Sequence, residues 1–266
     1  MSERKAIFIT GGASGIGLAV GKYFSERGWF VGLTDINEGG LAQAAGELAG
    51  DSFTHRLDVR DREAWDEALK AFHAAAGGRI DVVFNNAGIP VGGLLAENSV
   101  EEIDRCIDIN LRGVLYGAQA AYPFLKESAP GSCLLNTASA AGIYGSSGVS
   151  VYCATKFGVR AVAESLDAEW HEDGIKVASL MPSFIETPLL DLPPNHTTNE
   201  PVRANVKEAG LEITPVIEVA EAAWAAVHGD KLHSVVGKTA RRINFIARYL
   251  PSVMRKQAKQ SLRPLG

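Results

Sequence analysis

Near its N-terminus the chain reads Lys5-Ala6-Ile7-Phe8-Ile9-Thr10-Gly11-Gly12-Ala13-Ser14-Gly15-Ile16-Gly17, and this order sets our expectation for the whole fold. A short β-branched and aromatic run is followed at once by glycines and then by a helical pattern. Glycines let the backbone turn sharply and approach a pyrophosphate, whose charge suits the amides and dipole of a helix N-terminus. We therefore predict a dinucleotide-binding turn made by Gly11, Ser14, Gly15, Ile16 and Gly17.

An acidic residue, Asp35, arrives eighteen positions after Gly17, at the end of the next apolar run. Its carboxylate can accept hydrogen bonds from ribose hydroxyls but would repel a 2′-phosphate, and neither Gly12 nor Ile36 offers a cation to offset that repulsion. We therefore expect NAD to be favoured over NADP. The plainer interpretation is that Asp35 begins the helix from Asn37 onward, and both roles can hold together.

Strand and helix patterns alternate along the rest of the chain, which indicates an α/β fold with a doubly wound parallel sheet and helices on both faces. The expected strands are 5–10, 29–34, 52–57, 80–84, 132–137, 175–180 and 234–237. The expected helices include 37–49, 61–76, 100–127, 151–170 and 216–228.

The 266 residues, 46% of them hydrophobic, suit one Rossmann-type domain over 1–237 with a substrate lid at about 188–215 and a basic tail at 238–266. No apolar run approaches the roughly 18 residues of a membrane span, and no signal segment is evident, so we expect a cytoplasmic protein. Three widely spaced cysteines favour buried thiols over disulfides, and the histidines show no metal-ligand spacing.

A hydroxyl, a phenol and an ammonium lie within eighteen positions, at Ser139, Tyr152 and Lys156. On a helix, Tyr152 and Lys156 project from the same face, because they are four residues apart. A nearby cation favours the phenolate, so we expect Lys156 to lower the pKa of Tyr152 and let it exchange a proton with an alcohol. Ser139, at a strand end, can hold the substrate oxygen.

Several further motifs follow one another along the chain. They are Asp58-Val59, Asn85-Asn86-Ala87-Gly88, Asn110, and Pro182 to Pro188. These motifs join the glycine turn, Ser139 and the Tyr152–Lys156 pair. From about Lys5 to Pro188, their order and spacing resemble those of the classical short-chain dehydrogenase/reductases.

The resemblance implies a seven-stranded sheet in the order 3-2-1-4-5-6-7 and a catalytic tetrad of Asn110, Ser139, Tyr152 and Lys156. It also implies homodimers or homotetramers built through the helices near 100–127 and 151–170. Further cofactor contacts are expected from Asp58, Val59, Asn86, Ala87, Gly88, Tyr152, Lys156, Pro182, Ile185 and Thr187. Two residues depart from the family pattern. Ser183 stands where glycine is usual. Glu186 is unusual for the family, and its plainer interpretation is a solvent-facing charge.

The expected substrate surface is mostly apolar, which favours a lipophilic secondary alcohol or its ketone. It combines Ile89, Pro90, Val91, Ala141, Ile143, Tyr144, Phe184, Leu189, Leu190 and Leu192. His196 and Arg203 in the lid could change this expectation. The alternatives are an enoyl or polyol substrate, or a protein that binds a dinucleotide as a sensor without catalysis. A sensor has little need for Ser139, Tyr152 and Lys156 together.

The tail holds eight Lys/Arg and no Asp/Glu, which leaves 18 Lys/Arg against 31 Asp/Glu, a net charge of −13, on the remainder. Apolar residues recur in it at helical spacing, beginning with Ile243 and Ile246. We favour packing on its own or a neighbouring subunit, and keep contact with an anionic membrane as the alternative. Nucleic-acid binding is not expected.

Overall fold

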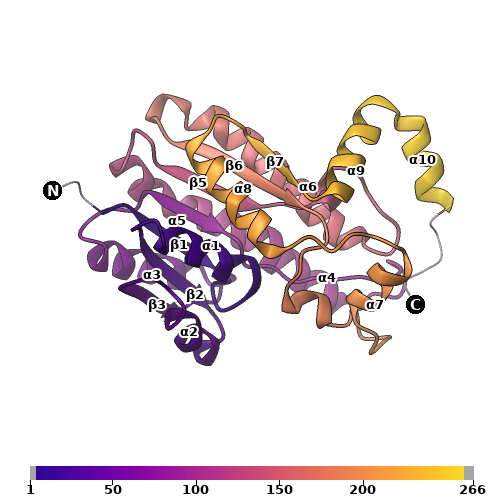
Figure 1. The fold of residues 1–266 in the computed structure, drawn as a ribbon, viewed down its shortest axis with the longest axis horizontal. Helices are drawn as coiled ribbons and strands as arrows, with labels where there is room; N and C mark the ends of the chain where they lie inside the picture. Colours follow the sequence, from indigo (N-terminus) through magenta and orange to yellow (C-terminus); the bar gives the residue numbers. More distant parts are fainter. Residues whose placement is uncertain (1–3, 261–266) are drawn as a thin grey trace.

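The computed structural model describes residues 4–260 and has a seven-stranded parallel sheet in the order β3-β2-β1-β4-β5-β6-β7 (Figure 1). The strands are β1 Ala6–Thr10, β2 Phe30–Asp35, β3 Ser52–Arg56, β4 Val82–Asn85, β5 Cys133–Thr137, β6 Lys176–Pro182 and β7 His233–Val236. This order confirms the predicted fold class. The strand order reverses between β1 and β4, and doubly wound sheets bind ligands at this topological switch point.

Two cores lie on opposite faces of the sheet, because alternate strand residues point to opposite sides. Ile7 and Ile9 of β1 face a core formed with α1 (Gly15–Ser25), α2 (Glu38–Ala45) and α8 (Val216–His228). Ala6 and Phe8 face the other core, formed with α3 (Arg62–Ala75), α5 (Gly113–Glu127) and α6 (Ser150–Glu169). With both faces covered, β1, β4 and β5 are buried along their whole length.

The helix expected over 100–127 is interrupted. It consists of α4 (Val100–Ile107), a π-helical turn over Asp108–Arg112, and α5. α4 begins at a capping box in which Ser99 and Glu102 exchange hydrogen bonds. The π turn contains Asn110, and such turns often occur at functional sites because the extra residue redirects a side chain.

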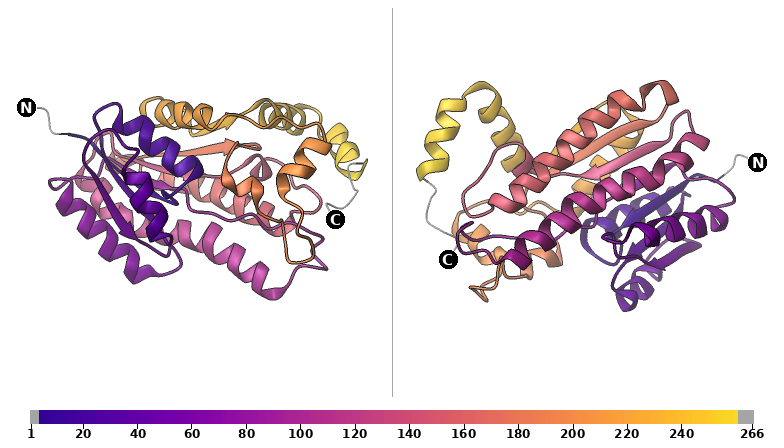
Figure 2. Two further views of the ribbon diagram at one scale, coloured as in Figure 1. Left: turned by 60° about the horizontal axis from the view of Figure 1, so that its bottom comes forward. Right: turned by 180° about the vertical axis from the view of Figure 1, so that it is seen from behind.

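The segment after β6, which we predict to be a substrate lid over about 188–215, has a 3₁₀ turn at Pro188–Asp191 and one short helix, α7 (Val202–Glu208). The tail forms α9 (Lys238–Tyr249) and α10 (Pro251–Gln260). Figures 1 and 2 show α7, α9 and α10 at the end of the molecule opposite the N-terminal label. Within residues 4–260, no helix combines the length and apolar character needed to cross a membrane. The final tail residues, 261–266, lie outside the described part.

Candidate active site

Ser139 and Tyr152 come together at the carboxyl end of β5. Ser139 is the N-cap of a 3₁₀ turn over Ala140–Gly142, and its Oγ accepts a hydrogen bond from Ala141 N at 3.1 Å. Tyr152 lies in the first turn of α6, where its side chain hydrogen-bonds to that of Ser139. Ser139 and Tyr152 are thirteen positions apart in sequence, but they meet because α6 begins beside the end of β5.

Burial raises the pKa of Tyr152 to about 12, while the hydrogen bond with Ser139 acts in the opposite direction. The expectation that Lys156 lowers this pKa below its ordinary value is thus wrong for the protein alone. The physical reason is that removal of the phenol from water disfavours the phenolate by more than the neighbouring groups favour it.

Lys156 is almost completely buried, with 3% of its surface exposed. Its Nζ donates a hydrogen bond to the Thr137 carbonyl at 2.8 Å and lies 5.6 Å from the centre of the Tyr152 ring. Burial lowers the pKa of Lys156 to about 8. The ammonium is therefore fixed by the end of β5 and faces the phenol, as the four-residue spacing predicted.

Asn110 is fully buried, and its amide group is held from three sides. Oδ1 accepts from Ile89 N at 2.9 Å, and Nδ2 donates to Ile89 O at 2.9 Å and to Cys106 Sγ at 3.4 Å. A Cβ at Gly88 would lie 3.2 Å from Asn110 Oδ1 and 3.6 Å from Lys156 Nζ, so these two side chains meet across Gly88.

Cys106 was not among the predicted site residues. Its thiol is fully buried beside Asn110, Thr155 and Lys156, and burial raises its pKa. Cys106 lies four residues before Asn110, a helical spacing that places the two side chains on one face. The contact between Asn110 Nδ2 and Cys106 Sγ is visible only in the structure.

The glycine turn leaves the N-terminus of α1 open. The Ser14 side chain caps no backbone group, and the first turn of α1 carries no acidic residue. Gly11 and Gly15 have φ of +64° and +55°, where side chains are disfavoured, and a Cβ at Gly11 would lie 2.9 Å from Ala87 Cα. Amide groups and the positive end of the helix dipole are thus available to an anion.

Asp35 ends β2 and faces this turn. Its Oδ2 accepts from Ala13 N at 3.2 Å and its Oδ1 from Asn37 N at 3.0 Å. The side chain that caps α2 is Asn37, which accepts from Gly40 N, so the helix-starting role belongs to Asn37. The sheet also pairs Asp35 in register with Arg56 of β3, a neighbour that position along the chain did not reveal.

Asn86 ties three strand ends together. Its N and Nδ2 donate to Thr10 Oγ1 and Thr10 O at 3.0 Å each, and its Oδ1 accepts from Thr137 Oγ1 at 3.1 Å. Ala87 N donates to Thr10 Oγ1. These predicted cofactor residues therefore line the junction of β1, β4 and β5.

Asp58 and Val59, two of the expected cofactor contacts, lie after β3. The Asp58 carboxylate is bound by Arg60 at 2.6 Å, and hydrogen bonding from Arg60 lowers the Asp58 pKa. Val59 is buried, and its carbonyl accepts from the Trp65 indole at 3.0 Å. Arg60 is thus a further charged group at this position.

The segment from Pro182 to Thr187 runs above the glycine turn. A Cβ at Gly15 would lie 3.3 Å from Thr187 Cβ, while Ile185 is buried and pairs with Thr214 in a short bridge. The Ser183 hydroxyl points toward the Val236 carbonyl at 3.5 Å. The lid therefore begins and ends beside the predicted cofactor residues.

Glu186 is not simply a solvent-facing charge. Arg203 of α7 contacts Glu186 Oε1 and Asp191 Oδ1, each at 2.6 Å. The hydrogen bonds with Asp191 and Glu186 raise the pKa of Arg203. At the other end of the lid, His196 contacts the Glu102 carboxylate at 3.0 Å through Nδ1. Arg203 and His196, the two lid side chains that could have received an anionic substrate, both contact carboxylates.

The expected substrate residues divide into two groups. Val91, Ile143 and Leu190 are buried, and the first two pack within apolar clusters rather than lining open surface. The remaining members are partly or largely exposed: Ile89, Pro90, Ala141, Tyr144, Phe184, Leu189 and Leu192. Within residues 4–260, no group of three or more His, Cys, Asp or Glu is arranged to hold a metal ion.

Comparison with known proteins agrees with this geometry. The model of the short chain dehydrogenase family matches residues 5–195. The 2,5-dichloro-2,5-cyclohexadiene-1,4-diol dehydrogenase LinX of Sphingobium indicum is 35% identical over 195 residues, which cover 72% of this chain and 77% of LinX.

Two solved structures share the fold. A short chain dehydrogenase/reductase from Burkholderia phymatum in complex with NAD has a TM-score of 0.82 at 22% identity, covering 96% of this chain and 97% of that chain. The 3-ketoacyl-(acyl-carrier-protein) reductase from Brucella melitensis, complexed with NADH, has a TM-score of 0.77 at 28% identity, covering 89% and 98%.

The sheet order and the matched sequence define an oxidoreductase of the Rossmann-fold type. The chain belongs to the short-chain dehydrogenase/reductase family.

Proposed function

We propose that this protein is an NAD(H)-dependent oxidoreductase that interconverts a lipophilic secondary alcohol and its ketone. The observation that carries the proposal is the meeting of the Ser139 and Tyr152 side chains beside the buried Lys156, at the strand ends next to the glycine turn. A non-catalytic dinucleotide sensor would have no use for this convergence.

The residues present fit a nicotinamide dinucleotide. The open N-terminus of α1 would take the pyrophosphate, since Ser14 leaves its amides uncapped, and Asp35 would accept from the adenosine ribose. Asn86, Ala87 and Gly88 would let the adenosine ribose lie against the backbone at the junction of β1, β4 and β5, and Ile185 and Thr187 would contact the carboxamide. The bound cofactor supplies the hydride acceptor or donor. The NADH complex of the Brucella relative supports this choice.

In the proposed reaction, the Ser139 hydroxyl holds the substrate oxygen and Tyr152 exchanges its proton. Because burial keeps Tyr152 protonated, the phenol is prepared to donate a proton to a ketone. For alcohol oxidation the phenolate must form, and the Lys156 ammonium, together with the charge of the oxidised cofactor, would favour it. Asn110, clamped by Ile89, keeps the wall beside Lys156 in place.

The substrate class follows from the lid. Its two candidate anion-binding side chains, Arg203 and His196, contact carboxylates of Glu186, Asp191 and Glu102. The neighbouring surface is apolar, with Phe184 and Leu189 partly exposed. A neutral, lipophilic substrate matches these contacts better than a carboxylate or phosphate ester. The diol dehydrogenase activity named for LinX also supports an alcohol substrate.

A spectrophotometric screen tests this function directly. NADH and NAD would be offered with ketones and alcohols of graded size and polarity, and with matched carboxylated analogues. We expect turnover of neutral lipophilic members and at least tenfold lower kcat/KM for their anionic analogues. Ser139→Ala should reduce turnover by roughly 100- to 1,000-fold, as loss of an oxyanion donor does. NADH binding without turnover of any panel member would instead support the sensor.

We also propose a homodimer or homotetramer formed through α4, α5 and α6. Leu115 and Phe157, on α5 and α6, expose 46% and 40% of their surface and would supply apolar contacts to a partner placed against these helices. The double variant Leu115→Ser, Phe157→Ser should lower the mass measured by light scattering, whereas an unchanged mass would place the interface elsewhere.

A further inference from the structure

The tail helix α9 has one buried face and one exposed face. Ala240, Ile243 and Ala247 lie on its inner face and pack against a core cluster that includes Ile143 and Met181. Ala240 is completely buried. This inner stripe satisfies the expectation that the tail packs on its own subunit, and it fixes the orientation of α9 on the body of the protein.

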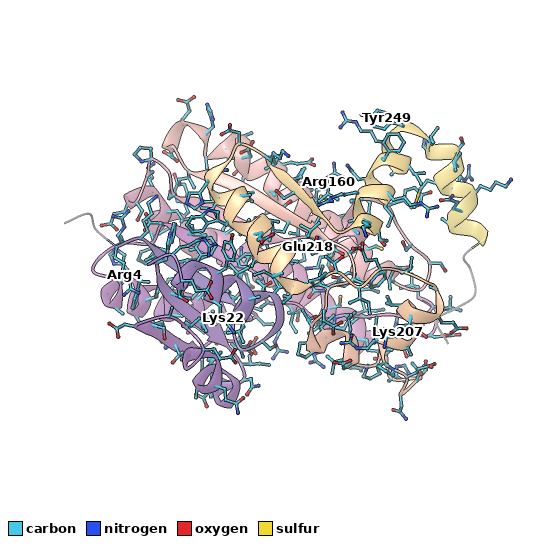
Figure 3. All side chains as sticks on the ribbon, in the orientation of Figure 1. Arg4, Lys22, Arg160, Lys207, Glu218 and Tyr249 are labelled. Atoms are coloured by element: carbon cyan, nitrogen blue, oxygen red, sulfur yellow. The ribbon has the colours of Figure 1, made fainter. Side chains whose placement is uncertain are left out.

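The outer face of α9 carries aromatic side chains that the described residues leave exposed. Phe245 and Tyr249, one turn apart, expose 58% and 61% of their surface, and their rings lie 5.0 Å apart. Figure 3 shows Tyr249 at the outer edge of α9. Leu250 and Val253, exposed by 46% and 40%, continue this apolar surface into α10, whose main neighbour is α9. Figures 1 and 2 show α10 projecting from the body.

Cations surround these aromatics. Arg241, Arg242 and Arg248 of α9 and Arg255 and Lys256 of α10 are all exposed, and residues 238–260 contain no Asp or Glu. At 100° per residue, Arg242 lies in the same row as Phe245 and Tyr249, while Arg241 and Arg248 flank that row. The outer face is thus an aromatic row bordered by guanidinium groups. We call this set, Arg241, Arg242, Phe245, Arg248, Tyr249, Leu250, Val253, Arg255 and Lys256, the outer tail surface.

We propose that the outer tail surface docks the protein onto an anionic lipid bilayer. Aromatic rings favour the boundary between headgroups and acyl chains, and exposed Arg and Lys beside them attract lipid phosphates. The surface is a projecting ridge (Figure 1) whose own charged side chains are all positive, with Glu212 beside Lys238 and Arg241 at the start of α9, so the protein lies on the bilayer and does not span it. The body, at net −13 outside residues 238–266, is repelled by the same bilayer, which leaves the tail as the point of contact.

A second copy of the chain is the competing occupant. Two outer tail surfaces cannot pair with each other about a two-fold axis without placing arginines against arginines. A tail could still bind the acidic body of another copy, but that contact would change the mass in solution, whereas binding to lipid would not.

The test is co-sedimentation of the full chain with vesicles. We expect binding to vesicles containing phosphatidylglycerol, at least tenfold weaker binding to pure phosphatidylcholine, and release on raising the salt concentration. Arg241→Glu with Arg242→Glu should weaken binding to the anionic vesicles at least tenfold. Phe245→Ser with Tyr249→Ser should weaken it while keeping the charge, and serves as the second, independent variant.

The matched control is Lys70→Glu with Lys231→Glu, which makes the same change in net charge at exposed positions on α3 and before β7. It should bind anionic vesicles like the unaltered protein. The proposal is overturned if the control loses as much vesicle binding as the Arg241/Arg242 variant. It is also overturned if the unaltered protein does not bind anionic vesicles. So does a fall in solution mass caused by either tail variant, which would assign the surface to a second copy.

Discussion

The Lys156 ammonium donates its hydrogen bond to the Thr137 carbonyl at 2.8 Å and faces the Tyr152 ring, with Nζ 5.6 Å from the ring centre. The cation is therefore held by the backbone at the end of β5, and not by the phenol oxygen. Such a buried charge is costly for folding, and it persists where its position is useful.

The cost of burying the Lys156 ammonium predicts that the stability of the protein depends on pH. Burial lowers the pKa of Lys156 to about 8, from 10.5, so the unfolded chain binds more protons between these values and stability from this group rises with pH from about 8 upward. Tyr152, with its pKa raised to about 12, acts in the opposite direction only above about pH 10. Lys156→Met should raise the free energy of unfolding at pH 7 by about 1 to 3 kcal/mol and abolish turnover.

Urea unfolding of both proteins at pH 7 and pH 9.5 checks this prediction. The difference between Lys156→Met and the unaltered protein should shrink at the higher pH. A variant that is less stable at pH 7 would show that the Thr137 hydrogen bond outweighs the cost of burying the ammonium.

Asp35 should determine the preference for NAD over NADP. Its carboxylate faces the glycine turn through Ala13 N, where it would repel a 2′-phosphate. Asp35→Asn keeps one side-chain oxygen for the local backbone but removes the charge, so kcat/KM for NADPH relative to NADH should rise at least tenfold. Steady-state kinetics with both cofactors measure this ratio. Equal use of the two cofactors by the unaltered protein would contradict the assignment.

Asn110 should matter for stability as well as for activity. Replacement by Leu leaves the N–H and C=O of the half-buried Ile89 without their side-chain partners, which costs about 1 to 3 kcal/mol for the two groups. Thermal unfolding should show a lower Tm, and turnover should fall. Cys106→Ala, which removes only the weak acceptor at 3.4 Å and a small volume, should have the smaller effect on both. A variant Asn110→Leu with unchanged Tm would argue against the clamp.

Arg203 should act on binding more than on folding. It connects α7 to Glu186 and Asp191 at the start of the lid, next to Ile185 and Thr187. Because the two carboxylates are largely exposed, Arg203→Met should change Tm little. We expect KM for the cofactor and the substrate to rise about three- to tenfold with a smaller change in kcat. Arg160→Met, which removes an exposed pair with Glu164 on α6, is the matched control and should leave KM unchanged.

Local patterns in the sequence were sufficient for the sheet and for the glycine turn, since β1, the turn and α1 are consecutive. The spacing of Tyr152 and Lys156 was equally informative, because helix geometry alone brings them to one face. The π turn was not predictable in this way. The turn contains Asn110, whose hydrogen-bond partner Ile89 is 21 positions away, and this pairing is not visible in local sequence patterns.

The same limit explains Glu186 and the tail. Position along the chain did not show that α7 places Arg203 against Glu186. It also did not show that β3 places Arg56 in register with Asp35. In the tail, helical spacing showed apolar residues without indicating which of them the body would cover. The shift in the pKa of Tyr152 also depends on burial, and burial is a property of the assembled site.

The most direct test of the proposed function is the turnover of Tyr152→Phe with a substrate found in the screen, measured beside NADH binding by fluorescence. We predict that kcat falls by roughly 100- to 10,000-fold while the dissociation constant for NADH changes less than about threefold, since the proton-exchanging group is removed and the cofactor contacts remain. Undiminished turnover in this variant would contradict the account and remove Tyr152 from the reaction.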